Sequence, residues 1–242
     1  MYIELDNVEM YYEKKGSGDP LILLHGNAQS HAVFNEAVDV LQEHFTCYTP
    51  DSRGHGQTRY LNEKTEAAAQ ERRDRQDRQG RPAPRGMLSY DAMADDVIQF
   101  IEKLGIERPV IYGFSDGGSS ALIIAEKKPD LLKKIMVSSV NVEPDGVKDS
   151  IIRSVKLQHM ITRSKKKKLL LDQPHISPEE MHRITIPTVV LVGEDDMIKR
   201  DHLDYIVKNI PKCRLKVLKG ESHSSYVIHN RKIADILIDF AS

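Results

Sequence analysis

The sequence contains no tryptophan, and only two of its 242 residues are cysteines. Two cysteines are too few for the framework of disulfides that holds small secreted domains together. No apolar run approaches the roughly 20 residues that a membrane-spanning helix requires. The opening stretch, MYIELDNVEMYYEKKG, lacks the basic start and the apolar centre of a signal peptide. We therefore expect a soluble, cytoplasmic protein.

The chain also lacks an excess of either charge. Its 35 Lys and Arg residues are balanced by 36 Asp and Glu residues, for a net charge of −1. No overall field favours nucleic acid or an anionic membrane, so we expect neither as a partner. The length and the 40% hydrophobic content suffice for one well-packed domain, which we expect to span residues 1–242. Cys47 lies in a predicted strand and is expected to be a small buried hydrophobe.

Strand and helix patterns alternate along most of the chain. Alternating apolar and polar residues at 1–7 and 8–16 predict an antiparallel hairpin. Short apolar runs predict strands buried on both faces, and helical spacing of apolar residues predicts amphipathic helices. The predicted strands are 20–26, 45–51, 109–114, 133–139, 186–196 and 214–220, and the predicted helices are 31–44, 89–105, 119–132, a stretch near 201–210, and 229–241. This alternation predicts an α/β fold, a mostly parallel sheet with helices on both faces.

Residues 61–86 depart from this pattern. They carry dense mixed charge and few large apolar side chains, so we expect a surface insertion. Its arginines allow an RNA-binding or scaffold hypothesis, but interleaved Asp and Glu residues oppose it.

A serine stands at the junction of a predicted strand and a predicted helix, in the run Gly113-Phe114-Ser115-Asp116-Gly117. A reactive serine must project where the backbone reverses sharply, and glycines two positions to either side remove the resulting clash. The helix that follows points free N–H groups toward the same place. The alternative is a phosphate-binding turn, but the lysine of a Walker loop and the spacing of a dinucleotide fingerprint are both missing. The pattern favours a nucleophile.

A serine nucleophile needs a base and an acid that orients the base. The carboxyl ends of parallel strands gather such groups at one edge of a sheet. Asp195 and Asp196 follow the apolar part of the strand at 186–196, TVVLVG, and His223 follows the strand at 214–220. The chain order is therefore Ser, Asp, His.

Five motifs together resemble the α/β-hydrolase superfamily, in its compact esterase-like branch with a small cap. They are HGN, DSRGHGQT, GFSDGG, GEDDMI and GESHSSYVIHN, in that order along nearly the whole chain. The resemblance implies Ser115 as nucleophile, His223 as base and Asp196, which precedes Met197 and Ile198, as acid. Asp195 is the alternative acid, with an N-cap or solvent-facing role otherwise. Glu143 and Asp145 are a distant third choice.

The resemblance also implies an oxyanion hole formed by the backbone N–H groups of Asn27 and Asp116. The Asp116 side chain is expected to point away into a hydrogen-bonded position. We expect no catalytic role for several other residues. His25 has a structural or oxyanion-side role, His202 lies on the surface, His229 caps or packs, and Asp51 pairs with Arg53 in a turn where neither Arg53 nor His55 is catalytic. No residue spacing indicates a metal site.

The implied activity is hydrolysis of a small ester or related acyl substrate through an acyl-enzyme, with no cofactor or metal. Haloalkane dehalogenases and epoxide hydrolases of this superfamily use an aspartate where Ser115 stands, so those reactions are disfavoured. Thioesterase, amidase, carbon–carbon bond hydrolase and cofactor-free perhydrolase activities stay open. So does a catalytically slow ligand-sensing or interaction protein on the same fold.

Residues 141–185, the cap segment, are expected to set substrate choice above the strand ends. Five apolar residues there either line a cleft or pack the segment onto the domain: Met160, Ile161, Leu169, Leu170 and Leu171. The run Lys165–Lys168 predicts a solvated helix face or loop, with an anionic-substrate, membrane-surface or localisation role as the alternative.

Overall fold

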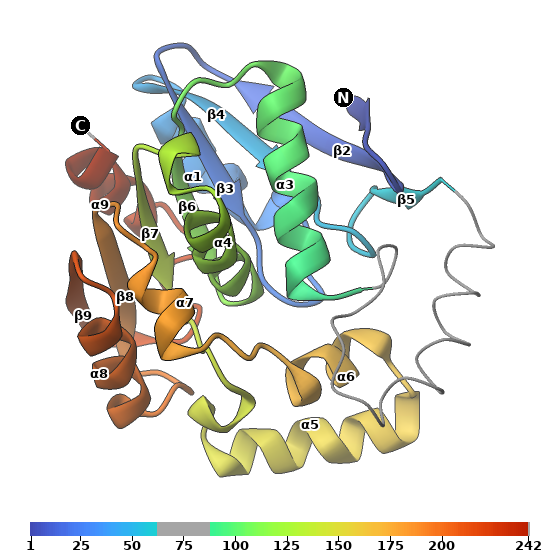
Figure 1. Cartoon of the computed structure of the whole chain (residues 1–242), viewed down its shortest axis with the longest axis vertical. Helices are drawn as coiled ribbons and strands as arrows, with labels where there is room; N and C mark the ends of the chain where they lie inside the picture. Colours follow the sequence, from blue (N-terminus) through green and yellow to red (C-terminus); the bar gives the residue numbers. More distant parts are fainter. Residues whose placement is uncertain (62–87, 242) are drawn as a thin grey trace.

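The computed structural model describes residues 1–61 and 88–241. Within these residues the chain folds around a nine-stranded sheet (Figure 1). The predicted charged insertion at 61–86 lies, except for Leu61, outside the described residues. The arginines on which the hypothesis of nucleic-acid binding depends are also outside the described residues.

The sheet follows the order β1-β2-β4-β3-β6-β7-β8-β9, and β5 pairs with β2. The six strands β4, β3, β6, β7, β8 and β9 pair in parallel. Strand β2 pairs antiparallel with β1, β4 and β5. The predicted mostly parallel sheet with an antiparallel N-terminal hairpin is therefore confirmed. The strands are β1 (Tyr2–Glu4), β2 (Val8–Lys15), β3 (Asp19–Leu24), β4 (Phe45–Pro50), β5 (Arg59–Tyr60), β6 (Val110–Phe114), β7 (Lys134–Ser138), β8 (Thr188–Asp195) and β9 (Cys213–Ser222).

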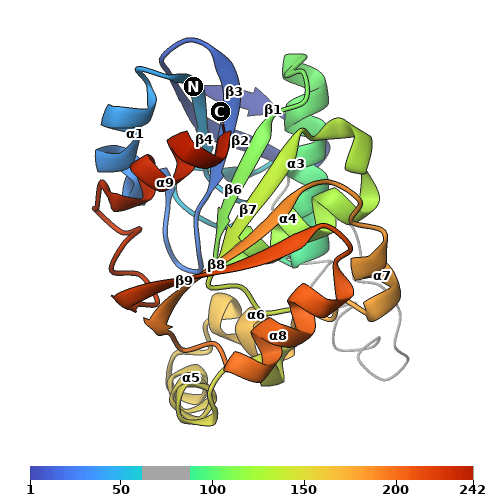
Figure 2. The same ribbon diagram turned by 90° about the vertical axis from the view of Figure 1, so that its left-hand side faces the viewer.

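Helices cover both faces of the sheet, as the sequence predicts (Figure 2). Helices α1 and α9 pack on one face, and α3, α4 and α8 pack on the other, each with its own hydrophobic cluster. The predicted helix at 31–44 begins as a 3-10 turn, His31–Phe34, before α1. The helices are α1 (Asn35–Leu41), α3 (Tyr90–Leu104), α4 (Asp116–Lys127), α5 (Asp149–Thr162), α6 (Lys165–Asp172), α7 (Pro178–His182), α8 (Arg200–Asn209) and α9 (Lys232–Ala241), with short 3-10 turns at Pro129–Leu131 and Pro144–Gly146.

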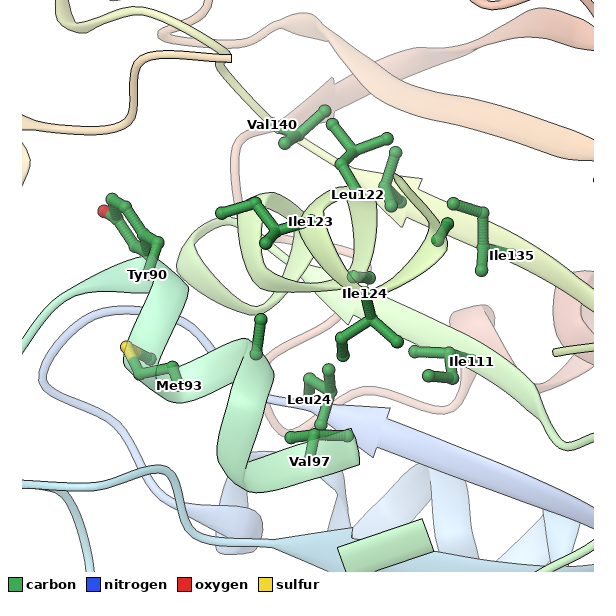
Figure 3. Packing of buried hydrophobic residues seen from close by; sticks show 14 of the residues in the cluster. Leu24, Tyr90, Met93, Val97, Ile111, Leu122, Ile123, Ile124, Ile135 and Val140 are labelled. Carbon is green, nitrogen blue, oxygen red and sulfur yellow. The ribbon is translucent and has the colours of Figure 1, made fainter. Parts of the chain in front are cut away.

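Helix α3 shows how local signals and packing agree. The Ser89 side chain caps its start by accepting a hydrogen bond from the Ala92 N–H at 3.1 Å. Gly105 ends it in the left-handed conformation, with φ of 62°. Its apolar face, including Met93 and Val97, packs with α4 over the sheet (Figure 3). This packing holds α4 in place, and with it Ser115, the residue directly before α4.

Helices α5, α6 and α7 occupy the cap segment between β7 and β8. The Asn27 side chain, in the loop after β3, donates to the Lys166 carbonyl at 3.1 Å and so ties α6 to the carboxyl end of the sheet. Leu169 is buried, as the packing interpretation requires. Met160 and Ile161 are 66% and 75% exposed, so for these two residues the packing interpretation is wrong.

Candidate active site

Ser115 occupies a one-residue bend between β6 and α4. Its backbone has φ of 53° and ψ of −115°, a conformation that an L-residue rarely adopts. The Ser115 carbonyl accepts hydrogen bonds from the Gly118 and Ser119 N–H groups at 2.8 and 3.1 Å, which begin the helix. The bend thus holds the serine side chain at the carboxyl end of the sheet, as the motif predicts.

The two flanking glycines are required by close backbone approach. A Cβ at Gly113 would lie 2.3 Å from the Gly117 carbonyl oxygen. A Cβ at Gly117 would lie 2.2 Å from the Leu24 carbonyl oxygen in β3. Neither contact can be relieved by rotating a side chain, because both partners are backbone atoms.

Gly117→Ala is therefore expected to destabilise the fold by about 3 kcal/mol or more, through displacement of α4 against β3. Gly118→Ala is the matched control, since its Cβ would approach the Gly113 carbonyl and the Val140 side chain at 3.1–3.3 Å only. Urea unfolding of both variants measures the difference. Equal free energies of unfolding would contradict the steric account of the bend.

His223 and Asp196 form a hydrogen-bonded pair at the ends of neighbouring strands. The His223 Nδ1–H donates to Asp196 Oδ1 at 2.9 Å. Asp196 is buried, and its carboxylate also accepts from the Ile198 N–H at 3.1 Å and from Ser139 Oγ at 2.6 Å. Burial raises the pKa of Asp196, but the hydrogen bonds from His223, Ser139 and Ile198 and the charge of His223 outweigh it, so the pKa falls below its usual value. The pair can hold an imidazole with Nε2 free to accept a proton.

His223 lies beside the bend that carries Ser115. Its ring centroid is 5.2 Å from that of Phe114, the residue before the serine. On the other side of the serine, the positive charge of His223 lowers the pKa of Asp116. Among the described residues Ser115 Oγ and the His223 ring share no hydrogen bond. Catalytic hydrogen bonds are often long in the absence of substrate and tighten when it binds.

The competing acids do not contact His223. Asp195, the last residue of β8, is exposed, whereas Asp196 beside it is buried, as expected for neighbouring side chains that point to opposite sides. Glu143 pairs instead with His175, with a Glu143 Oε2 to His175 Nδ1 distance of 2.5 Å. Asp145 is exposed in the 3-10 turn Pro144–Gly146.

Three other histidines have contacts that define different roles. His229 is exposed and pairs with Glu36 at 3.2 Å. His25 is buried, donates from Nδ1 to the Gly26 carbonyl at 2.9 Å and accepts at Nε2 from the Ser52 N–H at 3.0 Å. It therefore braces the loop after β3, a structural role. The expected surface position of His202 is wrong: it is half-buried, and its Nε2 accepts from the Val142 N–H at 3.0 Å.

The loop after β3 lies against the serine. A Cβ at Gly26 would be 3.2 Å from the Ser115 Cβ, so the Asn27 that follows is close to the bend. Among the described residues, the backbone N–H groups of Asn27 and Asp116 have no hydrogen-bond acceptor. Two unpaired donors beside one serine can bind an oxyanion.

The Asp116 carboxyl group occupies the hydrogen-bonded position that the sequence analysis expects. Asp116 Oδ1 accepts from Tyr90 Oη at 2.9 Å, and Oδ2 accepts from Asn27 Nδ2 at 2.8 Å. Burial raises the pKa of Asp116 to about 6, although both hydrogen bonds act to lower it. The group joins α3, α4 and the loop after β3.

The expected Asp51–Arg53 pair is wrong. Asp51 accepts from the backbone N–H groups of His31 and Gln57, each at 2.7 Å. Arg53 instead forms a buried two-bond pair with Asp96 in α3, at 2.5 and 2.7 Å. The carboxylates of Asp51 and Asp96 thus have structural roles, because they position the loop after β4.

Ser139 is a site residue that the sequence analysis missed. It follows β7, has φ of 54° and is buried. Its Oγ lies 2.6 Å from Asp196 Oδ2, 3.0 Å from the His223 carbonyl and 3.1 Å from Tyr226 Oη. The only signal in the sequence is a polar serine pair at the end of an apolar strand, which many turns share.

Among residues 1–61 and 88–241, no three or more His, Cys, Asp or Glu side chains are grouped so that they could hold a metal ion. No helix in the same residues has the length and apolar character to cross a membrane.

A family model described as alpha/beta hydrolase fold matches residues 19–158, more than half of the chain. The protein therefore belongs to the α/β-hydrolase fold family. Human serine hydrolase BPHL is 22% identical, with 93% of this chain and 80% of that protein covered. A soluble epoxide hydrolase of Corynebacterium sp. is 29% identical over 55% of this chain, but the match spans only 38% of that protein.

A solved structure of a carboxylesterase from Nitrososphaera gargenis has a TM-score of 0.77 and 16% identity, with 100% of this chain and 97% of that chain covered. At this identity the likeness shows the fold alone. The expected family and fold are confirmed.

Proposed function

We propose that the protein is a serine hydrolase that cleaves a small ester or related acyl substrate through an acyl-enzyme intermediate. The observation that carries the proposal is the hydrogen-bonded His223–Asp196 pair beside Ser115, which stands on a strained strand-to-helix bend. Two unpaired backbone N–H groups at the same place support it. The two free cysteines, one of them buried, support the expected cytoplasmic location.

In this mechanism His223 Nε2 removes the Ser115 hydroxyl proton as Oγ attacks the carbonyl carbon of the substrate. The Asn27 and Asp116 N–H groups bind the oxyanion of the tetrahedral intermediate. The same proton passes from His223 to the leaving group, and the acyl group stays on Ser115. A water molecule, deprotonated by His223, then releases the acid and restores the serine. Asp196 fixes the imidazole tautomer and stabilises its charged form.

The identity of residue 115 supports acyl chemistry over epoxide opening. The match to the soluble epoxide hydrolase covers about half of this chain, whereas the match to human serine hydrolase BPHL covers 93% of it. Ser115 stands where an epoxide hydrolase of this fold uses an aspartate. A serine nucleophile forms an acyl-enzyme ester, which water hydrolyses by attack at the ester carbonyl. This route needs no carboxylate nucleophile.

A fluorophosphonate probe tests the proposal directly. Intact-mass measurement of the labelled wild-type chain is expected to show one adduct, and Ser115→Ala is expected to show none. His223→Ala should react much more slowly, because the serine hydroxyl then lacks its base. A folded wild-type protein that takes no label would count decisively against a serine mechanism.

Ser139 is expected to act as a positioning residue for Asp196, if the triad operates as proposed. It is the only described residue that donates to Asp196 Oδ2. Loss of its hydroxyl raises the pKa of Asp196 and strengthens the attraction of Asp196 for the His223 proton. We expect Ser139→Ala to lower kcat about 10-fold with little change in KM, and to move the acid limb of the pH–rate profile to higher pH.

Ser139→Gly separates this role from a backbone role. Glycine accepts φ of 54° without strain but supplies no hydroxyl. The pH–rate profiles of both variants should shift alike. A Ser139→Gly enzyme with the wild-type profile and kcat would show that only the backbone conformation matters.

The buried Asp116 carboxyl predicts a pH-dependent stability difference. Because its folded-state pKa is about 6 against an ordinary 3.8, the unfolded chain ionises first as the pH rises, and the folded state loses stability between these values. The loss amounts to about 3 kcal/mol, complete above pH 6. Relative to wild type, Asp116→Asn should gain about this free energy of unfolding between about pH 4 and about pH 7.5. Urea unfolding at both pH values measures it, and a difference that is independent of pH would contradict the assignment.

A further inference from the structure

Helix α5 presents three large apolar side chains to solvent. Leu157, Met160 and Ile161 are 60%, 66% and 75% exposed. Their spacing of three and four residues places them together on one side of the helix. Helix α5 lies at the outer edge of the molecule (Figures 1 and 2), and these three side chains are exposed there. Three large apolar side chains grouped on one exposed helix are typical of an interaction site.

After Asp149, the first residue of α5, the charge along the segment has one sign. Residues 150–171 contain seven basic residues, Arg153, Lys156, Arg163 and Lys165–Lys168, and no Asp or Glu. Arg153, Lys156 and Arg163 are exposed, and among the described residues none of these three forms a hydrogen-bonded ion pair. We define the α5 surface as these three cations together with Leu157, Met160 and Ile161.

We propose that the α5 surface binds an anionic lipid surface. Aliphatic side chains bordered by Lys and Arg on one helix fit the boundary between lipid head groups and acyl chains, where both interactions stabilise the bound state. The three apolar residues are aliphatic, whereas single-stranded nucleic acids are bound by aromatic stacking, which this surface lacks. The expectation of no membrane partner rests on net charge, which does not reveal this local concentration of cations.

Docking through α5 also orients the candidate active site. Helix α6 follows α5 directly, and its Lys166 carbonyl accepts from Asn27 in the loop beside Ser115. The bound lipid surface would therefore lie beyond the carboxyl ends of the strands, the end of the sheet at which Ser115 stands. This inference does not depend on the proposed serine mechanism.

Vesicle co-sedimentation of the full chain tests the proposal. Wild type is expected to bind phosphatidylcholine vesicles that contain phosphatidylserine at least about tenfold more tightly than pure phosphatidylcholine vesicles, and less tightly as salt is added. A triple variant, Leu157→Gln, Met160→Gln and Ile161→Gln, should lose about tenfold or more in affinity. Arg153→Gln with Lys156→Gln should lose the preference for the anionic lipid.

The matched control is Tyr205→Gln with Val217→Gln, which removes exposed apolar groups from α8 and β9 and should bind as wild type does. Every substituted residue is exposed, and urea unfolding checks that each variant is folded. Equal vesicle binding by wild type and the triple variant would overturn the proposal, as would no binding by wild type. Sedimentation velocity covers the remaining case: a wild-type dimer that the triple variant abolishes, without vesicle binding, would assign the surface to a second copy and also overturn it.

Discussion

Ser115→Ala is expected to lower kcat/KM for an aryl ester by about 10⁴-fold or more, with the free energy of unfolding little changed. The serine oxygen is the only atom that the proposed mechanism bonds to the acyl group, and a water molecule in its place is held and activated less well. Some rate above that in water should survive, because the Asn27 and Asp116 N–H groups remain. Initial rates at several substrate concentrations give the ratio.

Ser120→Ala is the matched control for this variant. Ser120 lies in α4, the helix that Ser115 precedes, and is buried, but its hydroxyl only donates to the Asp116 carbonyl at 3.0 Å. Its removal should leave kcat/KM within a few-fold of wild type. Similar losses in both variants would assign the effect to the helix rather than to the serine oxygen.

Asp196→Asn is expected to have the second largest effect, a fall in kcat of about 10³–10⁴-fold, the size of loss seen for the equivalent acid in serine proteases. An amide at this position cannot balance the charge of a protonated His223. It also places N–H donors where the carboxylate now accepts hydrogen bonds from His223, Ser139 and the Ile198 N–H. Steady-state rates of the variant across pH measure the loss.

Asp195→Asn makes the comparison specific. Asp195 has the same charge and lies next along the chain, but it is exposed and makes no contact with His223. We expect near wild-type kcat for this variant. A large loss in Asp195→Asn together with an active Asp196→Asn would reverse the choice of acid.

The positions of Ser115, Asp196 and His223 could be predicted because each of these residues follows the end of a strand. Apolar runs identified the parallel strands, and the carboxyl ends of such strands meet at one edge. Asp196 and His223 are 27 residues apart, yet both follow neighbouring strands, so their contact follows from the topology. The bend at Ser115 was predictable as well, because glycines two positions to either side of a serine, between a strand and a helix, are typical of a sharp backbone reversal.

Contacts between side chains on different elements could not be predicted in this way. Arg53 pairs with Asp96, 43 residues away, although Asp51 is nearer in sequence. Which carboxylate an arginine meets depends on how α3 packs on the sheet, and periodicity does not give that packing. The contact between Ser139 and Asp196 depends likewise on the register between β7 and β8. The exposure of Met160 and Ile161 was missed for the opposite reason, since apolar residues alone do not show whether a partner covers them.

Covalent trapping of the acyl group tests the central claim most directly. Wild-type protein is incubated with an aryl carbamate, whose acyl group leaves a serine slowly, and is then digested and analysed by mass spectrometry. The account predicts one carbamoyl group, on the peptide that contains Ser115, formed as the aryl alcohol is released in equal amount. Continued release of the alcohol with no modification of Ser115, or with modification at another residue that supports turnover, would contradict it.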